Sequence, residues 1–145
     1  MGANVRSEKD IRELAALGCN IRLCKGAYME PPEIAFPEKE KVDQNFKRLT
    51  GIMLESPCFS AIATHDEKMI RHTEQLISDS RISDARFEFQ MLFGVRRERQ
   101  VELVNEGYPV RIYVPFGTQW APYFIRRLAE RPANLFFVLR NLAKK

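Results

Sequence analysis

The stretch 123–130 carries two adjacent arginines, Arg126 and Arg127, three and four residues after Tyr123. On a helix this spacing places the two arginines on one face with Tyr123 and Glu130. Paired guanidinium groups donate parallel, charge-assisted hydrogen bonds, which suit a carboxylate or a phosphate. A charged face of this kind is also ordinary on a helix that faces water. The stretch therefore indicates either an anion-binding site or a solvated helix face.

Further polar side chains occur where short apolar runs end. Four runs have the length and composition of β-strands: residues 19–28, 59–64, 86–92 and 110–114. The polar residues near their carboxyl ends are Lys25, Tyr28, Thr64, His65, Asp66, Gln90 and Tyr113. Parallel strands present their carboxyl ends on one side of a sheet, where α/β proteins build their sites. We therefore expect these residues to contribute to one site.

Helices must connect these strands and hold them in place. The apolar spacing predicts helices at residues 7–18, at 38–56, after 66, from about 96 to 107, at 123–130 and from about 135. A proline-rich loop is expected at 30–37 and another loop at 78–85. In the helix from 96, Val101 and Val104 are expected to point inward. His65 and Asp66 could equally serve as the cap of the helix that follows them, because Asp suits an N-cap.

The alternation of strands and helices predicts a single α/β domain, 1–145, with a parallel sheet and right-handed crossovers. Two architectures fit this order: an open doubly wound sheet and part of a (β/α) barrel. A dinucleotide-binding sheet would need GxGxxG after a strand, and the sequence contains none. Polar residues at several strand ends favour the barrel.

Composition excludes several classes of protein. The 145 residues are 45% hydrophobic and 29% charged, which is enough apolar material for a core. The net charge of +4 comes without a dense basic block, so no nucleic-acid partner is expected. No apolar run approaches the roughly 20 residues of a transmembrane helix. Three cysteines without metal-ligand spacing indicate reduced thiols, a cytoplasmic setting and no metal site; Cys24, within an apolar run, is expected to pack.

Taken together, several segments resemble proline dehydrogenase, most closely the monofunctional bacterial type. They occur in the family's order and are residues 22–28 (RLCKGAY), 63–66 (ATHD), 88–94 (EFQMLFG), 111–117 (RIYVPFG) and 123–134. The resemblance implies a distorted (β/α)8 barrel that binds FAD noncovalently. It also implies oxidation of L-proline to 1-pyrroline-5-carboxylate, with the electrons passing to a quinone.

The resemblance implies a role for each site residue. Arg22 would lie near the reactive nitrogen of the flavin, where a cation favours the negative charge that arrives with hydride. The other implied FAD contacts are Lys25, Gly26, Ala27, Thr64 and His65. Arg126 and Arg127 would clamp the proline carboxylate, and the residues implied around its ring are Tyr123, Tyr113, Tyr28 and Leu92.

These residues also have plainer interpretations. Arg22 could form an ion pair at a barrel end, and Tyr113 and Leu92 could belong to the core. Arg22 and Lys25 are three residues apart, so a regular strand would direct them to opposite faces. A bend near Gly26 would bring them together.

The chain corresponds to about half of such a barrel, its strands 5–8 and C-terminal helix, since a complete barrel takes about 200 residues or more. The catalytic aspartate and substrate-binding lysine of the family come from earlier strands and have no counterpart here. We therefore expect a C-terminal fragment of the enzyme that pairs with an N-terminal half-barrel. The alternative is a non-catalytic half-barrel that self-associates and does not bind FAD. The expected location is the cytoplasm; the second possibility is peripheral attachment to the inner face of the membrane.

Overall fold

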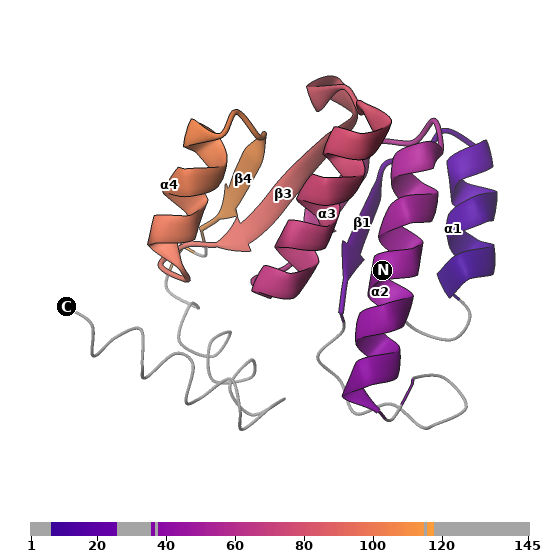
Figure 1. Ribbon diagram of the computed structural model, residues 1–145, viewed down its shortest axis with the longest axis horizontal. Coiled ribbons are helices and arrows are strands. Elements are labelled where there is room, and N and C mark those ends of the chain that lie inside the picture. Colours follow the sequence, from indigo (N-terminus) through magenta and orange to yellow (C-terminus); the bar gives the residue numbers. More distant parts are fainter. Residues whose placement is uncertain (1–6, 26–35, 37, 115, 118–145) are drawn as a thin grey trace.

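The computed structural model describes residues 7–25, 36, 38–114 and 116–117, in which helices and strands alternate (Figure 1). The elements are α1 Ser7–Ala16, β1 Ile21–Cys24, α2 Lys39–Glu55, β2 Ser60–Ala63, α3 Glu67–Ser80, the short 3₁₀ helix η1 Asp84–Arg86, β3 Phe87–Leu92, α4 Arg97–Asn105 and β4 Val110–Tyr113. The predicted alternation of strands and helices is confirmed throughout these residues.

The four strands form one parallel sheet in the order β1-β2-β3-β4. Each strand pairs with the strand that precedes or follows it in the chain, for example Leu23 with Ile62 and Ile62 with Phe89. Parallel neighbours need a crossover connection, and α2, α3 and α4 provide one each. All four strands therefore present their carboxyl ends on the same side of the sheet.

The helices cover one face of this sheet (Figure 1). Alternate strand residues point to that face, and three of them, Leu23, Ile62 and Phe89, are at most 1% exposed within the core that the helices cover. Burying an aliphatic or aromatic side chain contributes about 1.5–3 kcal/mol, so this apolar layer holds the strands in register. A doubly wound sheet carries helices on both faces, and the described helices do not, which favours the barrel-type alternative.

The opposite face of the sheet is more polar. Its residues alternate with the core positions: Arg22, Cys24, Ala61, Ala63, Glu88, Gln90, Leu92, Arg111 and Tyr113. Small side chains on β2 leave room between the larger ones on β1 and β3, since Ala61 lies between Arg22 and Glu88 in the register. A face of this composition can form a site that the helix-covered face cannot.

The element boundaries differ from the predictions in two places. The first strand is short, since β1 ends at Cys24 rather than at residue 28. The region predicted as a loop, 78–85, is partly ordered: α3 continues to Ser80, and the η1 turn starts at Asp84, where the Ser83 side chain accepts the N–H of Ala85. The sheet is otherwise formed from the predicted strands.

The prediction that Val101 and Val104 point inward is wrong. They are 52% and 57% exposed, whereas Leu103 is fully buried and Arg99 and Gln100 are almost so. The inner face of α4 thus combines Leu103 with two polar side chains that meet polar groups. The amide of Gln100, for instance, donates to the carbonyls of Leu92 and Val95, each at 2.8 Å, and so closes the end of β3.

The helices predicted at 123–130 and from residue 135 lie outside the described residues, as does the proline-rich loop except at Phe36. Within the described part of the chain, no helix combines the length and apolar character that crossing a membrane requires.

Candidate active site

A pocket of about 350 Å³ opens at the carboxyl ends of the strands. Residues from all four β/α units line it: Arg22, Cys24, Ala63, His65, Gln90, Met91, Leu92 and Tyr113. Five of the residues singled out in the sequence are thus brought together although they span more than 90 positions in the chain: Arg22, His65, Gln90, Leu92 and Tyr113. The walls combine a guanidinium group, an imidazole and an amide with apolar side chains.

His65 connects two neighbouring strand ends. Its Nε2 accepts the backbone N–H of Leu92 at 2.8 Å, which links the loop after β2 to the end of β3. Burial, together with the positive charge of Arg96, lowers the pKa of His65 from 6.5 to about 4. The ring is therefore neutral near pH 7, and because Nε2 is an acceptor, Nδ1 carries the proton. His65 thus offers one N–H donor at the wall of the pocket.

Lys25 lies on the helix side of the sheet. Its Nζ forms ion pairs with Asp43 of α2 and, at 2.7 Å, with Asp66. Strand alternation continues past Cys24, so Arg22 faces the pocket while Lys25 faces α2, and the two cations are not brought together. Burial raises the pKa of both carboxyl groups, but the hydrogen bonds and charge of Lys25, together with Lys39 at Asp43 and the N–H of Lys68 at Asp66, outweigh it, so both pKa values are lowered.

Thr64 and Asp66 shape the turn between β2 and α3. The buried Thr64 hydroxyl accepts the N–H of Asp66 at 3.1 Å, and the Asp66 carboxylate accepts the N–H of Lys68 at 3.0 Å. Asp66 is therefore the N-cap of α3, while His65 faces the pocket. The two interpretations of this pair are combined: the aspartate caps and the histidine lines the site.

Three polar residues share the pocket's face of the sheet further from the strand ends. Arg111 donates two hydrogen bonds to the buried Glu88, at 2.6 and 2.9 Å, and Gln90 donates a third at 2.6 Å. The hydrogen bonds from Arg111 lower the pKa of Glu88 despite its burial. Glu88 thus fixes the amide of Gln90, which lines the pocket.

Cys24 and Arg96 are near the site but were not anticipated as site residues. Cys24, predicted to pack, is only half-buried and lines the pocket; its position two residues after Arg22 places it on the same strand face and could have revealed this. Arg96, whose guanidinium group donates to the carbonyl of His65 at 2.8 Å, has no sequence signal of comparable strength. The remaining expected site residues, Gly26, Ala27, Tyr28, Tyr123, Arg126 and Arg127, lie outside the described residues.

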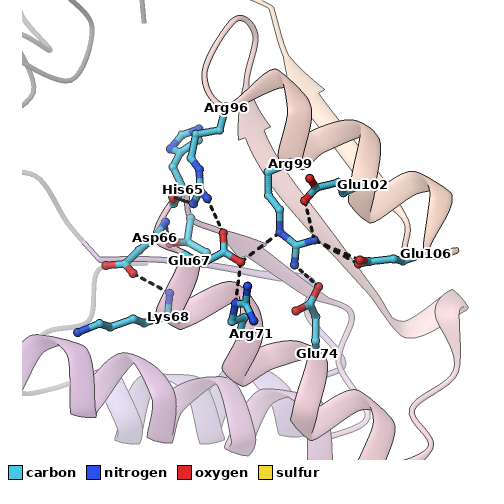
Figure 2. Close-up of polar contacts among 11 residues, drawn as sticks. His65, Asp66, Glu67, Lys68, Arg71, Glu74, Arg96, Arg99, Glu102 and Glu106 are labelled. Atoms are coloured by element: carbon cyan, nitrogen blue, oxygen red, sulfur yellow. Dashed lines mark hydrogen bonds and ion pairs between the residues drawn. The ribbon is translucent and has the colours of Figure 1, made fainter. Parts of the chain in front are cut away.

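A second charged cluster lies on the helix side, between α3 and α4. Figure 2 shows the Arg99 guanidinium group surrounded by carboxylates, of which Glu67 and Glu74 come from α3. This cluster lines a second pocket of about 370 Å³, which shares no lining residue with the pocket at the strand ends. Its ion pairs join the two helices, and no group of described residues has the composition of a metal site.

The sequence model of the proline dehydrogenase family matches residues 5–140. This chain belongs to the proline dehydrogenase family. Proline dehydrogenase 1 of Bacillus subtilis strain 168 is 50% identical over 140 residues, which cover 97% of this chain and 46% of the relative. Proline dehydrogenase of Deinococcus radiodurans is 45% identical over 139 residues, 96% of this chain and 45% of the relative. The chain thus spans about half the length of these proline dehydrogenases.

The fold of this family member matches solved structures of related proteins. The crystal structure of proline utilization A (PutA) from Bdellovibrio bacteriovorus aligns with a TM-score of 0.78 at 24% identity, over 88% of this chain and 16% of that chain. A structure of PutA with proline bound in remote sites aligns with a TM-score of 0.74 at 25% identity, over 97% of this chain and 16% of that one. The predicted fold class is confirmed: parallel β/α units that correspond to about half of a (β/α) barrel.

Proposed function

We propose that this chain carries the C-terminal half of a proline dehydrogenase site, which oxidises L-proline to 1-pyrroline-5-carboxylate with FAD and passes the electrons to a quinone. One observation supports this most strongly. Arg22, His65, Leu92 and Tyr113, contributed by four successive β/α units, line a single pocket at the carboxyl ends of the strands. In barrel enzymes that side of the sheet is where the chemistry takes place.

The residues of the pocket suit a flavin. The ring system of FAD is flat and apolar with polar atoms along one edge, and the pocket offers apolar walls beside N–H donors on Arg22, His65 and Gln90. When bound, FAD would accept the two electrons that proline loses. Arg22 would favour negative charge on the reduced ring, and the neutral His65 would donate a hydrogen bond through Nδ1–H. The further FAD contacts assigned by the resemblance are Gly26, Ala27 and Thr64; Lys25, which the resemblance also assigns to FAD, faces α2 and is paired with Asp43 and Asp66.

The proline side of the site is assigned by the family resemblance. Arg126 and Arg127 would bind the substrate carboxylate, which is costly to bury unless it is paired. Each charge-assisted bond to it contributes on the order of 1.5–3 kcal/mol. Tyr113 and Leu92, which line the pocket, would contact the proline ring. The further ring contacts assigned in this way are Tyr28 and Tyr123.

The proposal requires a second half-barrel. The catalytic aspartate and substrate-binding lysine that the resemblance implies come from earlier strands, so residues 1–145 form one partial domain of a larger barrel. Within the described residues, β1 and β4 each pair with a single neighbour, which leaves an edge on both sides of the sheet for further strands. We propose that N-terminal β/α units of a proline dehydrogenase occupy these edges, in the cytoplasm or at the inner face of the membrane.

Flavin binding tests the proposal directly. The full chain, mixed with an N-terminal half of the Bacillus subtilis relative, is titrated with FAD and its absorbance and proline-dependent dye reduction are measured. Arg22→Met is expected to weaken FAD binding at least about tenfold, because one charged contact is lost. Arg12→Met on the exposed side of α1 is the matched control and should bind FAD as the wild type does. Absence of FAD binding in the wild-type mixture would refute the proposal.

One observation favours the alternative of a self-associating half-barrel without FAD. Large apolar side chains near the ends of β3 and β4 are exposed, among them Phe93 at 65%, Val114 at 51% and Phe116 at 92%. An apolar patch of this kind is typical of an interface. This alternative predicts a dimer in sedimentation and a colourless protein after incubation with FAD; a monomer at micromolar concentration contradicts it.

A further inference from the structure

Arg96 joins two loops at the carboxyl side of the sheet. It is the residue before α4, and its guanidinium group donates to the carbonyl of His65 at 2.8 Å and to the carboxylate of Glu67 (Figure 2). His65 in turn accepts the N–H of Leu92. The end of β3 and the turn after it are thus held to the segment after β2 by three hydrogen bonds, one donated by Leu92 and two donated by Arg96.

The backbone of Arg96 supports a specific role for this side chain. Its φ is 52° and its ψ is 50°, a left-handed conformation that residues other than glycine rarely adopt. Such strain costs about 1 kcal/mol or more and persists where surrounding contacts determine the conformation. Arg96 has no side-chain capping bond to α4, so its contacts with His65 and Glu67 are what define its position.

We propose that Arg96 is a positioning residue for the cofactor site: through its bonds to His65 and Glu67 it fixes the His65 imidazole against Leu92, with Nδ1–H as the donor at the pocket. The inference rests on the proposed FAD site, to which it adds a residue that does not line the pocket. Without Arg96 the His65 loop loses two anchors, and the ring can rotate or exchange its protonated nitrogen.

Charged and titratable groups from several elements surround His65. Arg96 faces it from the start of α4, and Asp66 and Glu67 follow it in its own turn. Asp66 is paired with Lys25 and Glu67 with Arg96, Arg99 and Arg71, so both carboxylates already have cationic partners. From β1 and β4, Arg22 and Tyr113 line the same pocket. Arg96 is the one among these whose charge lowers the pKa of His65.

The experiment observes the imidazole itself. The chain contains two histidines, His65 and His72, so ¹⁵N–¹H NMR of the full chain without FAD resolves the tautomer and the titration of each ring. In the wild type we expect His65 to be an Nδ1–H tautomer that titrates near pH 4. In Arg96→Met and Arg96→Gly we expect a mixture of tautomers and a His65 pKa that rises toward 6.5. Unchanged His65 signals in both variants would overturn the proposal.

The set of variants distinguishes the effect of losing the Arg96 side chain from the effect of relieving its positive φ. Arg96→Gly removes the side chain but relieves the positive φ, so it should fold even where Arg96→Met does not. Arg96→Lys keeps the charge and should restore part of the wild-type tautomer preference. Arg97→Met, at the neighbouring exposed arginine of α4, should leave both histidines unchanged. His72 on α3 reports whether a variant has kept its fold.

FAD titration then links the ring to the cofactor. Arg96→Gly should bind FAD about tenfold more weakly than the wild type, the loss of one oriented hydrogen bond, while Arg97→Met should not differ. If the wild-type chain, mixed with the N-terminal half of the Bacillus subtilis relative, binds no FAD, the proposed function fails. The histidine spectra then still show whether Arg96 fixes the tautomer of His65. If FAD binds the wild type and Arg96→Gly equally, the positioning role is refuted and the proposed function stands.

Discussion

The ammonium group of Lys25 lies 2.7 Å from the carboxylate of Asp66, which at the same time caps α3. Asp43 of α2 is the second partner of Lys25. All three side chains are less than a third exposed, so this cluster ties the end of β1 to two helices in a partly desolvated setting. The cation is therefore part of the fold, on the side of the sheet opposite the proposed cofactor site.

Lys25→Met should destabilise the chain by about 2 kcal/mol, because two partly buried carboxylates lose their common cation. Urea unfolding followed by circular dichroism measures the change. Lys41→Met, whose exposed partner is Glu38, is the control and should cost less than about 1 kcal/mol. Equal losses in the two variants would show that the cluster contributes no more than a surface pair.

Leu103→Ala should lower the free energy of unfolding by about 2–4 kcal/mol. Leu103 is fully buried on the inner side of α4, so its truncation leaves a cavity. Val104→Ala, one residue along and 57% exposed, should change stability by about 0.5 kcal/mol or less. Thermal and urea unfolding of the pair provide the comparison. A larger loss at Val104 would mean that α4 is rotated so that Val104, and not Leu103, faces the core.

Stability should fall as the pH is lowered from about 6.5 to about 4. His65 is held neutral in the folded chain, while in the unfolded chain it binds a proton below pH 6.5, so acid favours unfolding across this window. Integrated over the window, the effect is on the order of 3 kcal/mol. Urea midpoints from pH 7 to pH 4 test this, and His65→Gln should flatten the profile; a wild-type profile that is already flat contradicts the assignment.

Arg126→Met should weaken the binding of a proline analogue about tenfold or more, because a carboxylate loses a charge-assisted partner. Calorimetric titration of the chain mixed with the N-terminal half of the Bacillus subtilis relative measures the affinity. Lys144→Met serves as the control, since it removes one positive charge elsewhere in the C-terminal segment. Small, equal effects would assign Arg126 to a solvated helix face instead.

The strands were predictable because each is a short apolar run bounded by a helical pattern. Alternation along β1 also placed Arg22 on the face opposite Lys25, as the structure has it. The sequence did not predict which side chains of α4 point toward the core. Hydrophobicity favoured Val101 and Val104, but Arg99 and Gln100 lie inward, where Arg99 pairs with Glu74 and Gln100 donates to two backbone carbonyls.

The pocket was predictable in outline, since polar residues at the ends of parallel strands must gather on one side. Its supporting contacts were not. Arg96 follows a strand in a turn with ordinary composition, and its bond to His65 spans 31 positions of the chain. A contact of this kind depends on how two loops pack, and no periodicity in the sequence encodes it.

The strand order of the sheet, identical to the order of the chain, has a consequence for how the protein is made. Each strand pairs only with a strand already next to it in the sequence, so every β/α unit can dock onto its predecessor as it leaves the ribosome. The covalent link between units then serves mainly to raise their local concentration. A nick in the loop between α2 and β2 should leave two pieces that find each other again and restore the same sheet.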